Sequence, residues 1–195
     1  MRGNVLRARK FGQSGMTLIE LMIATVVLLV GILSVTGLLA LVIGNNGRSK
    51  VDTTATMLSQ AVTEQVSAVL QGGGPASIQD CVGNAWTIGV DYTTAAGPPG
   101  WGAAVSGSKI DFTQSNPPAT SHMDFVECSK QPNGVVVRNV YDVRWNVQQM
   151  SLGDTSTEYF NGTFLVTVGA RPKYGLPTQY NFALPVNMQV YVGGY

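Results

Sequence analysis

The hydrophobic residues of this 195-residue chain follow three patterns that succeed one another along the sequence. Residues 16–43 are almost uniformly apolar. Residues 51–69 are apolar only at helical spacing, which is typical of an amphipathic helix. From Val135 onward, large apolar residues alternate with polar ones, which is typical of β-strands with two different faces.

The first apolar stretch, Met16–Ile43, is long enough to cross a membrane. As a helix it would extend for roughly 42 Å, against about 30 Å for the hydrocarbon core of a bilayer. Its only charged residue is Glu20, and no lysine or arginine lies within the stretch to neutralise it. Because an unpaired carboxylate is costly in apolar surroundings, we expect Glu20 to need a partner from outside its own helix.

The second stretch predicts an amphipathic helix over residues 44–71, half-buried on a globular domain. Gly44–Gly47 predicts the exit into water, after which the helix resumes. Gly72–Pro75 predicts its end, because glycine and proline together terminate helices. The expected buried positions are Val51, Ala55, Leu58, Val62, Val66 and Val69.

Residues 72–195 predict a globular antiparallel β domain. Its longest expected strand contains Tyr141–Val147, where the alternation predicts one buried face and one face in water. Asn161-Gly162 predicts a tight hairpin turn, and Pro185 predicts an edge position or a bulge for the last strand. The other expected strands are Ala85–Val90, Lys109–Phe112, Met123–Cys128, one with Phe164, Val166 and Val168, and one with Met188, Val190 and Val192.

Two segments rich in glycine or proline, Ala95–Trp101 and Asn116–His122, predict loops that connect these strands. An exposed Trp101 would offer a contact point for a partner. The more common arrangement is a tryptophan that folds back onto its own domain, and this is what we expect.

The first 15 residues form a basic leader, because they carry Arg2, Arg7, Arg9 and Lys10 and no acidic residue. Such a segment is a targeting signal, and its charge favours the cytoplasmic side of the membrane. Without the leader, eight Lys and Arg remain against 11 Asp and Glu, so the net charge is about −3. The remaining basic residues are scattered, which argues against a generic grip on nucleic acid.

The junction between leader and helix resembles that of the type IV pilins and of the pseudopilins of type II secretion. It reads Gly15-Met16-Thr17-Leu18-Ile19-Glu20, and the resemblance covers roughly residues 7–43. It implies that prepilin peptidase cuts between Gly15 and Met16, that Met16 is then methylated, and that Glu20 pairs with the terminal amine of a neighbouring subunit. Met16 is a departure, because many pilins have phenylalanine there.

The resemblance implies an α+β fold in which the long N-terminal helix packs on a C-terminal antiparallel β-sheet. It implies four regions: a leader over residues 1–15 that is removed, a transmembrane and filament-core helix over 16–43, the amphipathic helix over 44–71 and the β domain over 72–195. The strands Tyr141–Val147 and Phe164–Val168 are similar to the C-terminal pattern of minor pilins.

The function implied is therefore that of a minor type IV pilin, a subunit anchored in the bacterial inner membrane and then assembled into a pilus. The leader would be cytoplasmic and the C-terminal domain periplasmic. The implied partners are other pilin subunits, the prepilin peptidase and N-methyltransferase, the inner membrane and the pilus assembly platform. The alternatives are a type II secretion pseudopilin and a pilin that acts as a ligand-binding, adhesion or DNA-binding module.

The two cysteines, Cys81 and Cys128, both belong to the exported part of the chain. An oxidising periplasm favours a disulfide between them, which would stabilise the fold by about 4 kcal/mol for a loop of this length. The alternatives are two buried free thiols or a metal site, although two cysteines with the distant His122 do not have zinc spacing.

No catalytic motif is visible in the sequence. It contains no nucleophile elbow, no Walker loop and no dinucleotide-binding fingerprint, and His122 is its only histidine. Asp111, Asp124 and Glu127 lie close in sequence, and a calcium site built from them is the weaker alternative to carboxylates that face solvent. We assign His122 no role, and we expect neither enzymatic activity nor a cofactor or metal.

Overall fold

The computed structural model describes residues 15–91, 93–95, 99–150, 162–174 and 184–193. Residues 1–14 of the predicted leader, residues 96–98 of the first predicted loop and Asn161 of the predicted turn lie outside these ranges. The chain divides into two compact units, Met1–Asn45 and Asn46–Tyr195.

One helix, α1 (Leu18–Leu70), runs through the boundary between the units, and it contains Gly44–Gly47 without interruption. The prediction that the helix resumes after this segment is wrong. Each glycine in a helix interior costs about 1 kcal/mol relative to alanine, but the segment contains no proline, so every backbone hydrogen bond can still form. Long helical stretches on either side are therefore able to continue through it.

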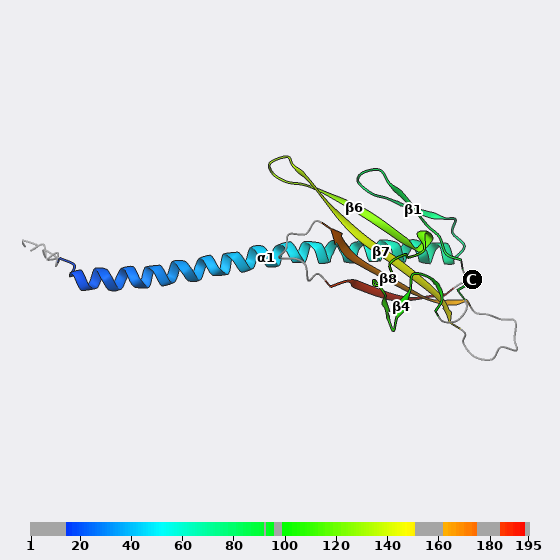
Figure 1. Cartoon of the computed structure of the whole chain (residues 1–195), viewed down its shortest axis with the longest axis horizontal. Helices are drawn as coiled ribbons and strands as arrows, with labels where there is room; N and C mark the ends of the chain where they lie inside the picture. Colours follow the sequence, from blue (N-terminus) through cyan, green and yellow to red (C-terminus); the bar gives the residue numbers. More distant parts are fainter. Residues whose placement is uncertain (1–14, 92, 96–98, 151–161, 175–183, 194–195) are drawn as a thin grey trace, which may run out of the picture. The chain divides into compact units, whose positions relative to one another are not determined.

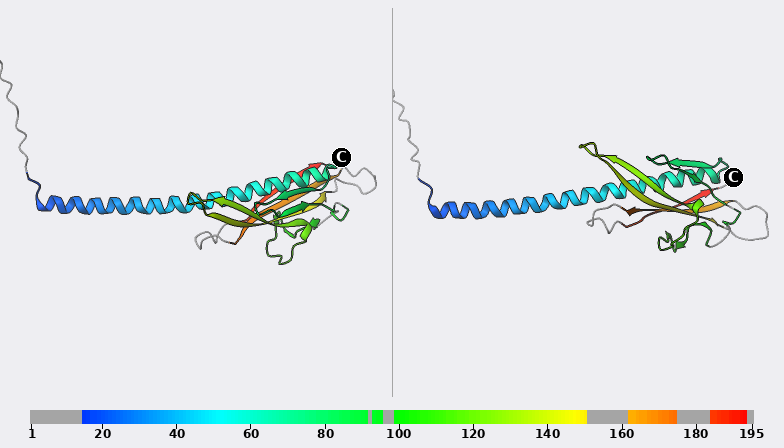
Figure 2. Two further views of the ribbon diagram at one scale, coloured as in Figure 1. Left: turned by 90° about the horizontal axis from the view of Figure 1, so that it is seen from above. Right: turned by 45° about the horizontal axis from the view of Figure 1, so that its top comes forward.

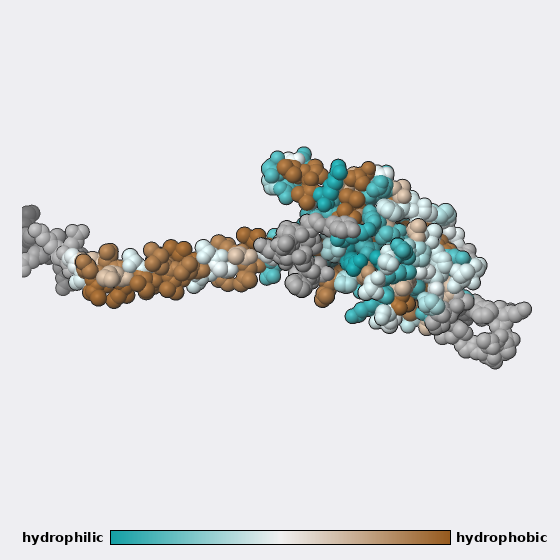
Figure 3. All heavy atoms as spheres, viewed as in Figure 1, coloured by the Kyte–Doolittle hydropathy of each residue, from teal (hydrophilic) through white to brown (hydrophobic). Residues whose placement is uncertain are grey.

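The first unit contains the apolar part of α1. Its large apolar side chains are exposed, from Leu18 at 77% to Ile43 at 70%, and Figure 3 shows them as brown spheres. The helix is long and apolar enough to cross a membrane. Within the part of the chain that the structure describes, this apolar surface is not buried.

In the second unit, residues 46–70 of α1 pack on the sheet (Figure 1). The buried positions are Val51, Ala55, Leu58, Val62, Val66 and Leu70, which matches the predicted face except that Leu70 takes the place of the half-buried Val69. The helix ends as predicted. Gly72 has a φ of +85°, its N–H donates to the Val69 carbonyl (3.2 Å), and the Gly73 N–H donates to the Ala68 carbonyl (2.9 Å).

The main sheet is antiparallel and has five strands, in the order β3-β7-β8-β9, with β6 also paired to β7. The α+β architecture predicted from the sequence is confirmed. Pro185 immediately precedes β9, which is an edge strand as expected. The strands of this sheet are β3 (Trp101–Gly102), β6 (His122–Lys130), β7 (Val136–Met150), β8 (Thr163–Tyr174) and β9 (Val186–Gly193).

Two small hairpins accompany the main sheet: β1 (Ala76–Gln79) pairs with β2 (Ala85–Ile88), and β4 (Val105–Ser106) pairs with β5 (Lys109–Ile110). A single turn of 3₁₀ helix, η1 (Ala119–Ser121), precedes β6. Strands were predicted at the places of β2, β5 and β6, whereas β1, β3 and β4 were missed. The missed strands have only two to four residues, which is too short for a recognisable alternation.

The apolar core lies between α1 and one face of the sheet. Tyr141, Val143, Trp145 and Val147 of β7 are at most 1% exposed, and they pack with Phe164, Val166 and Val168 of β8 as predicted. The third predicted set is only partly buried, because β9 is at the edge. Val192 is 5% exposed, whereas Val190 is 38% exposed.

The opposite face of β7 is also buried, so the prediction that it faces water is wrong. Asp142, Arg144 and Asn146 are 1%, 5% and 3% exposed. The segment that carries β4 and β5 lies on the side of the sheet away from α1 (Figure 2). It supplies partners to this face: the Asn146 side chain donates to the carbonyls of Pro99 (3.1 Å) and Ala103 (2.8 Å).

The covering segment joins β7 through β3, where Trp101 pairs with Val147. Trp101 is partly buried against the core, so the expectation that it folds back onto its own domain is confirmed. The preceding Gly100 has a φ of +78°, and a Cβ at this position would lie 2.6 Å from the Val147 carbonyl oxygen. This position therefore requires glycine both for its backbone conformation and for its close approach to β7.

The structure also confirms the predicted disulfide between Cys81 and Cys128, whose Cα atoms are 5.9 Å apart. The bond joins the turn after β1 to the C-terminal part of β6. The Cys81 N–H donates to the Val126 carbonyl beside it (3.3 Å). The β1–β2 hairpin, which is not part of the main sheet, is thereby held against the edge of β6.

The close approach at Gly100 generates a test with a matched control. Gly134, in the turn between β6 and β7, has nearly the same φ (+82°), but nothing lies within 4 Å of its Cβ position. Both Gly100→Ala and Gly134→Ala carry a positive-φ penalty of about 1–2 kcal/mol. We expect Gly100→Ala to lower the free energy of unfolding by at least about 1 kcal/mol more, because only it also displaces β3 from β7. Chemical denaturation of the two variants measures the difference, and equal losses would contradict it.

Candidate functional site

The start of α1 is closed by two reciprocal hydrogen bonds between Thr17 and Glu20. The Thr17 N–H donates to Glu20 Oε2 (3.5 Å), and the Glu20 N–H donates to Thr17 Oγ1 (3.4 Å). This is a capping box, in which a threonine and a glutamate three residues later satisfy each other's free backbone N–H groups. Glu20 therefore has a partner in its own chain, contrary to the expectation from the sequence, which considered only charged side chains.

The capping box also determines where the carboxylate lies. Glu20 is in the first turn of α1, where the positive end of the helix dipole favours an anion. Met16 precedes this turn, and its side chain is 64% exposed. In a single chain, the Glu20 carboxylate thus lies beside the residue that cleavage would convert into a new amino terminus.

A second cluster of charges lies on the polar face of the sheet, around Asp142. Arg144 binds this carboxylate with two hydrogen bonds, from Nε to Oδ1 (2.8 Å) and from Nη2 to Oδ2 (2.9 Å). Arg171 donates to the same Oδ2 from Nε (3.2 Å) and Nη2 (3.1 Å). His122 Nε2 lies 3.4 Å from Oδ1. One carboxylate therefore holds side chains from β6, β7 and β8 together.

The environment of Asp142 favours its charged form. Burial alone would raise the pKa of the Asp142 carboxyl, but hydrogen bonds from His122 and Arg144 and the positive charges of Arg144 and Arg171 outweigh this effect. Together they hold the pKa of Asp142 well below its usual range. The group is thus an anion at neutral pH, with both oxygens occupied by arginine.

The two arginines also bind the segment that covers this face. Arg144 Nη1 donates to the carbonyls of Gln114 (2.8 Å) and Asp111 (3.4 Å). The Phe112 ring lies 5.2 Å from the Arg144 guanidinium carbon and 4.7 Å from that of Arg171. Such cation–π contacts stabilise the position of the ring when the cation is partly desolvated.

His122, Asp124 and Asp142 approach one another closely enough to suit a metal ion, because their ligand atoms lie within 4.8 Å of one another. The surrounding charges argue against that use. Asp124 Oδ2 binds Lys173 Nζ at 2.6 Å, and Asp142 is bound by two arginines. Three permanent cations therefore already outnumber the two carboxylates, and a divalent ion would be repelled. We interpret the cluster as a structural ion-pair network.

The calcium site considered from the sequence is not assembled. Asp124 and Glu127 are an odd number of residues apart on β6, so they face opposite sides of the sheet. Asp111 follows β5, and its carboxylate accepts hydrogen bonds from the N–H (2.8 Å) and hydroxyl (2.6 Å) of Thr113. Glu127 accepts one from the Asn139 amide (3.2 Å).

Residues 10–36 match the family model of the prokaryotic N-terminal methylation motif. The match covers the last basic residue of the leader, the Gly15–Met16 junction, the capping box and the apolar helix as far as residue 36. The chain carries the leader of type IV pilins and pseudopilins. No curated protein and no solved structure was found to match the chain.

The structure separates the predicted site residues into two places. Gly15, Met16 and Glu20 lie together at the start of α1 in the first unit. Cys81 and Cys128 lie together in the second unit as a disulfide. Cleavage after Gly15, methylation of Met16 and the role of Glu20 in assembly stay predictions.

The ion-pair network of the second unit was not predicted from the sequence. His122 was given no role, and Asp142 and Arg144 were placed on a face in water. The period-2 pattern could not reveal this, because it is the same whether water or another segment covers the polar face. The sequence did contain one signal of this network. Asp142 and Arg144 are an acidic and a basic residue two positions apart on one strand, so their side chains lie on the same face and can form an ion pair.

The central carboxylate can be tested through Asp142→Asn, which keeps the shape of the side chain and removes its charge. The variant leaves the buried Arg144 and the half-exposed Arg171 without their counter-charge. We expect the free energy of unfolding at pH 7 to fall by about 3–5 kcal/mol. Denaturant unfolding of the wild type and the variant measures this loss.

The same variant should change the pH dependence. The pKa of Asp142 is lowered in the folded state, so its contribution to stability is present above the unfolded pKa of about 3.9 and is lost as the pH falls through the folded pKa. The stability of Asp142→Asn should therefore fall less steeply in acid. Glu64→Gln, on the exposed face of α1, is the control and should behave like the wild type. Parallel pH curves for Asp142→Asn and wild type would contradict the assignment.

Proposed function

We propose that this chain is a minor pilin, a structural subunit of a type IV pilus. The observation that carries the proposal is the methylation motif at residues 10–36, which supports a type IV pilin or pseudopilin subunit. The apolar first unit and the α+β fold are what such a subunit needs, and the motif and fold point to a structural subunit and not to an enzyme. The motif also implies processing by prepilin peptidase and assembly with other pilin subunits.

In the proposed life cycle, the leader stays in the cytoplasm while α1 anchors the chain in the inner membrane and the disulfide-bonded domain lies in the periplasm. Cleavage after Gly15 and methylation give a mature chain that begins at Met16. The apolar helix then leaves the membrane for the core of the filament. Its exposed apolar side chains support this step, because helices of neighbouring subunits would cover the surface that lipid covered before.

Glu20 would direct this assembly by changing partners. In the single chain its carboxylate accepts a hydrogen bond from the Thr17 N–H at a long distance of 3.5 Å. A neutral N–H is a weaker partner than an ammonium group. We propose that the terminal amine of a neighbouring subunit's Met16 pairs with Glu20 when the two helices pack together. The pairing would favour one axial offset between subunits, because any other offset leaves a charge unpaired in apolar surroundings.

Processing can be tested directly. When the full-length chain is produced together with a prepilin peptidase, mass spectrometry should find a mature protein that begins at Met16 and carries one additional methyl group. Gly15→Leu should leave the precursor uncut, because it replaces the glycine that precedes the proposed cut with a bulky residue. A mature protein that retains residues 11–15 would contradict the proposed function.

The role of Glu20 can be separated from helix capping with two variants. Glu20→Leu removes both the charge and the cap, and we expect it to be exported, processed and folded yet incorporated into filaments about tenfold less or worse. Glu20→Gln retains the capping geometry, since glutamine also closes a capping box. Quantification of each variant in sheared filaments and in the membrane fraction makes the measurement.

Charge pairing predicts that Glu20→Gln fails to assemble as severely as Glu20→Leu. Thr17→Val provides the matched control, because it removes the reciprocal threonine bond and keeps the carboxylate. Its assembly should stay within a few-fold of the wild type. Normal assembly of Glu20→Gln would contradict the pairing mechanism and would assign the glutamate to the cap.

A further inference from the structure

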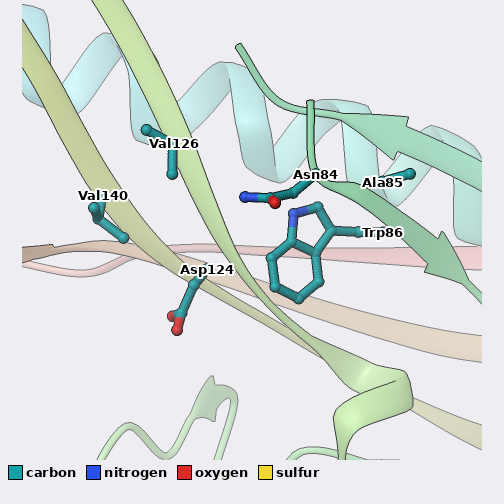
Figure 4. A pocket seen from close by; sticks show the side chains of 6 residues that line it. All are labelled: Asn84, Ala85, Trp86, Asp124, Val126 and Val140. Atoms are coloured by element: carbon teal, nitrogen blue, oxygen red, sulfur yellow. The ribbon is translucent and has the colours of Figure 1, made fainter. Parts of the chain in front are cut away.

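A hollow beside the ion-pair network has the lining of a ligand site, and its position is shown in Figure 4. Its volume is about 490 Å³, within the range of about 300–1,000 Å³ that is usual for small-molecule sites. It is bounded by the end of the β1–β2 hairpin, by β6 and by β7. The lining residues are Asn84, Ala85, Trp86, Asp124, Val126 and Val140. We propose that this hollow binds a neutral saccharide.

The apolar part of the lining suits the carbon face of a sugar ring. Val126 and Val140 are direct partners across β6 and β7, so their side chains lie next to each other on one face. The indole of Trp86 extends from β2 toward β6 (Figure 4). A flat aromatic surface beside aliphatic side chains excludes water and offers contact area at a low cost in conformational entropy.

The polar part of the lining has both a donor and an acceptor that make no hydrogen bond. Among the residues that the structure describes, Trp86 Nε1 and Asp124 Oδ1 are buried atoms that make no hydrogen bond. His122 Nε2 lies 3.2 Å from this Asp124 oxygen and 3.4 Å from Asp142 Oδ1, so a single N–H is shared between two carboxylates and the Asp124 oxygen can still accept a hydrogen bond from a ligand. A hydroxyl group donates and accepts, so a polyhydroxyl ligand can satisfy both atoms.

The charge of the lining favours a neutral ligand. Asp124 is the only charged residue among the six, and Lys173 Nζ binds its other oxygen at 2.6 Å. Its negative charge is therefore already compensated, which leaves no attraction for a cationic ligand and no free cation for an anionic one. Neutral hydroxyl groups are the chemistry that remains.

The hollow is held in shape before any ligand arrives. The disulfide fixes the turn that precedes Asn84 to β6. Within this turn, Asp80 accepts hydrogen bonds from the Asn84 N–H (2.8 Å) and from its side-chain amide (2.9 Å). Such preorganisation reduces the entropy lost on binding. This inference goes beyond the proposed function, because it does not depend on cleavage or on assembly.

The test uses the full-length chain in a detergent without a sugar headgroup, with its three tryptophans labelled with ¹⁵N at the indole nitrogen. Cellobiose, lactose and chitobiose are added separately, with glycerol as a linear polyol control. At least one disaccharide should shift the Trp86 indole signal saturably, with a Kd of about 1 mM or tighter. The signals of Trp101 and Trp145, which do not line the hollow, should stay in place.

Because Trp86→Phe lacks the reporting indole, binding to this pair of variants is measured by isothermal titration calorimetry. Trp86→Phe should weaken the binding by about tenfold or more, whereas Trp101→Phe should leave it unchanged. Val140→Trp is the second variant, because Val140 lines the hollow and is only partly buried, so a large side chain there fills the hollow. It should abolish the shift of the Trp86 signal. The proposal is overturned if no disaccharide moves this signal, if glycerol moves it equally, or if Val140→Trp binds as the wild type does. Binding of an apolar dye in the same hollow without any sugar response would also overturn it.

Discussion

The pairing of Asp142 with Arg144 is the interaction on which the architecture of the second unit depends. A charge at a central strand position must either face water or find a partner, and here the partner is two residues away on the same strand. Once paired, the two side chains form a surface that a second layer can cover, and the backbone carbonyls of Gln114 and Asp111 bind Arg144 from above. The sheet therefore has two buried faces, one apolar against α1 and one polar against the segment that carries β4 and β5.

The sequence predicted those parts of the fold that follow from local periodicity. The helical spacing of Val51, Ala55 and Leu58 and the alternation in Tyr141–Val147 each require one apolar surface, so the layering of helix on sheet follows from them. The continuity of α1 through Gly44–Gly47 and the burial of Asp142 did not follow. Whether a helix continues through a glycine-rich segment depends on how many helical turns flank that segment. Whether a polar face is buried depends on a covering segment far away in the sequence. Neither is visible in a short window of residues.

The same limitation explains what was found and missed at the start of α1. The methylation motif around Gly15 could be predicted from the sequence, because it is defined by particular residue types at fixed spacing. The capping box was not predicted, because only charged side chains were expected to be partners of Glu20. The first backbone N–H groups of a helix are hydrogen-bond donors as well. Thr17 satisfies the carboxylate locally, at the long distance of 3.5 Å, so the interaction is easily exchanged for a stronger one.

Glu20 and Asp142 show how one physical rule gives two different roles. Both are carboxylates in positions where an unpaired charge is costly. Asp142 has both oxygens occupied by arginines of its own chain, so its partner set is complete and its role ends with the fold. Glu20 lies among apolar side chains that a single chain leaves exposed, and its local partner is uncharged. A buried charge whose partners all lie in its own chain stabilises the domain. A charge that lacks a charged partner in its own chain favours association with a second chain. This difference is why we propose an assembly role for Glu20 in the first unit.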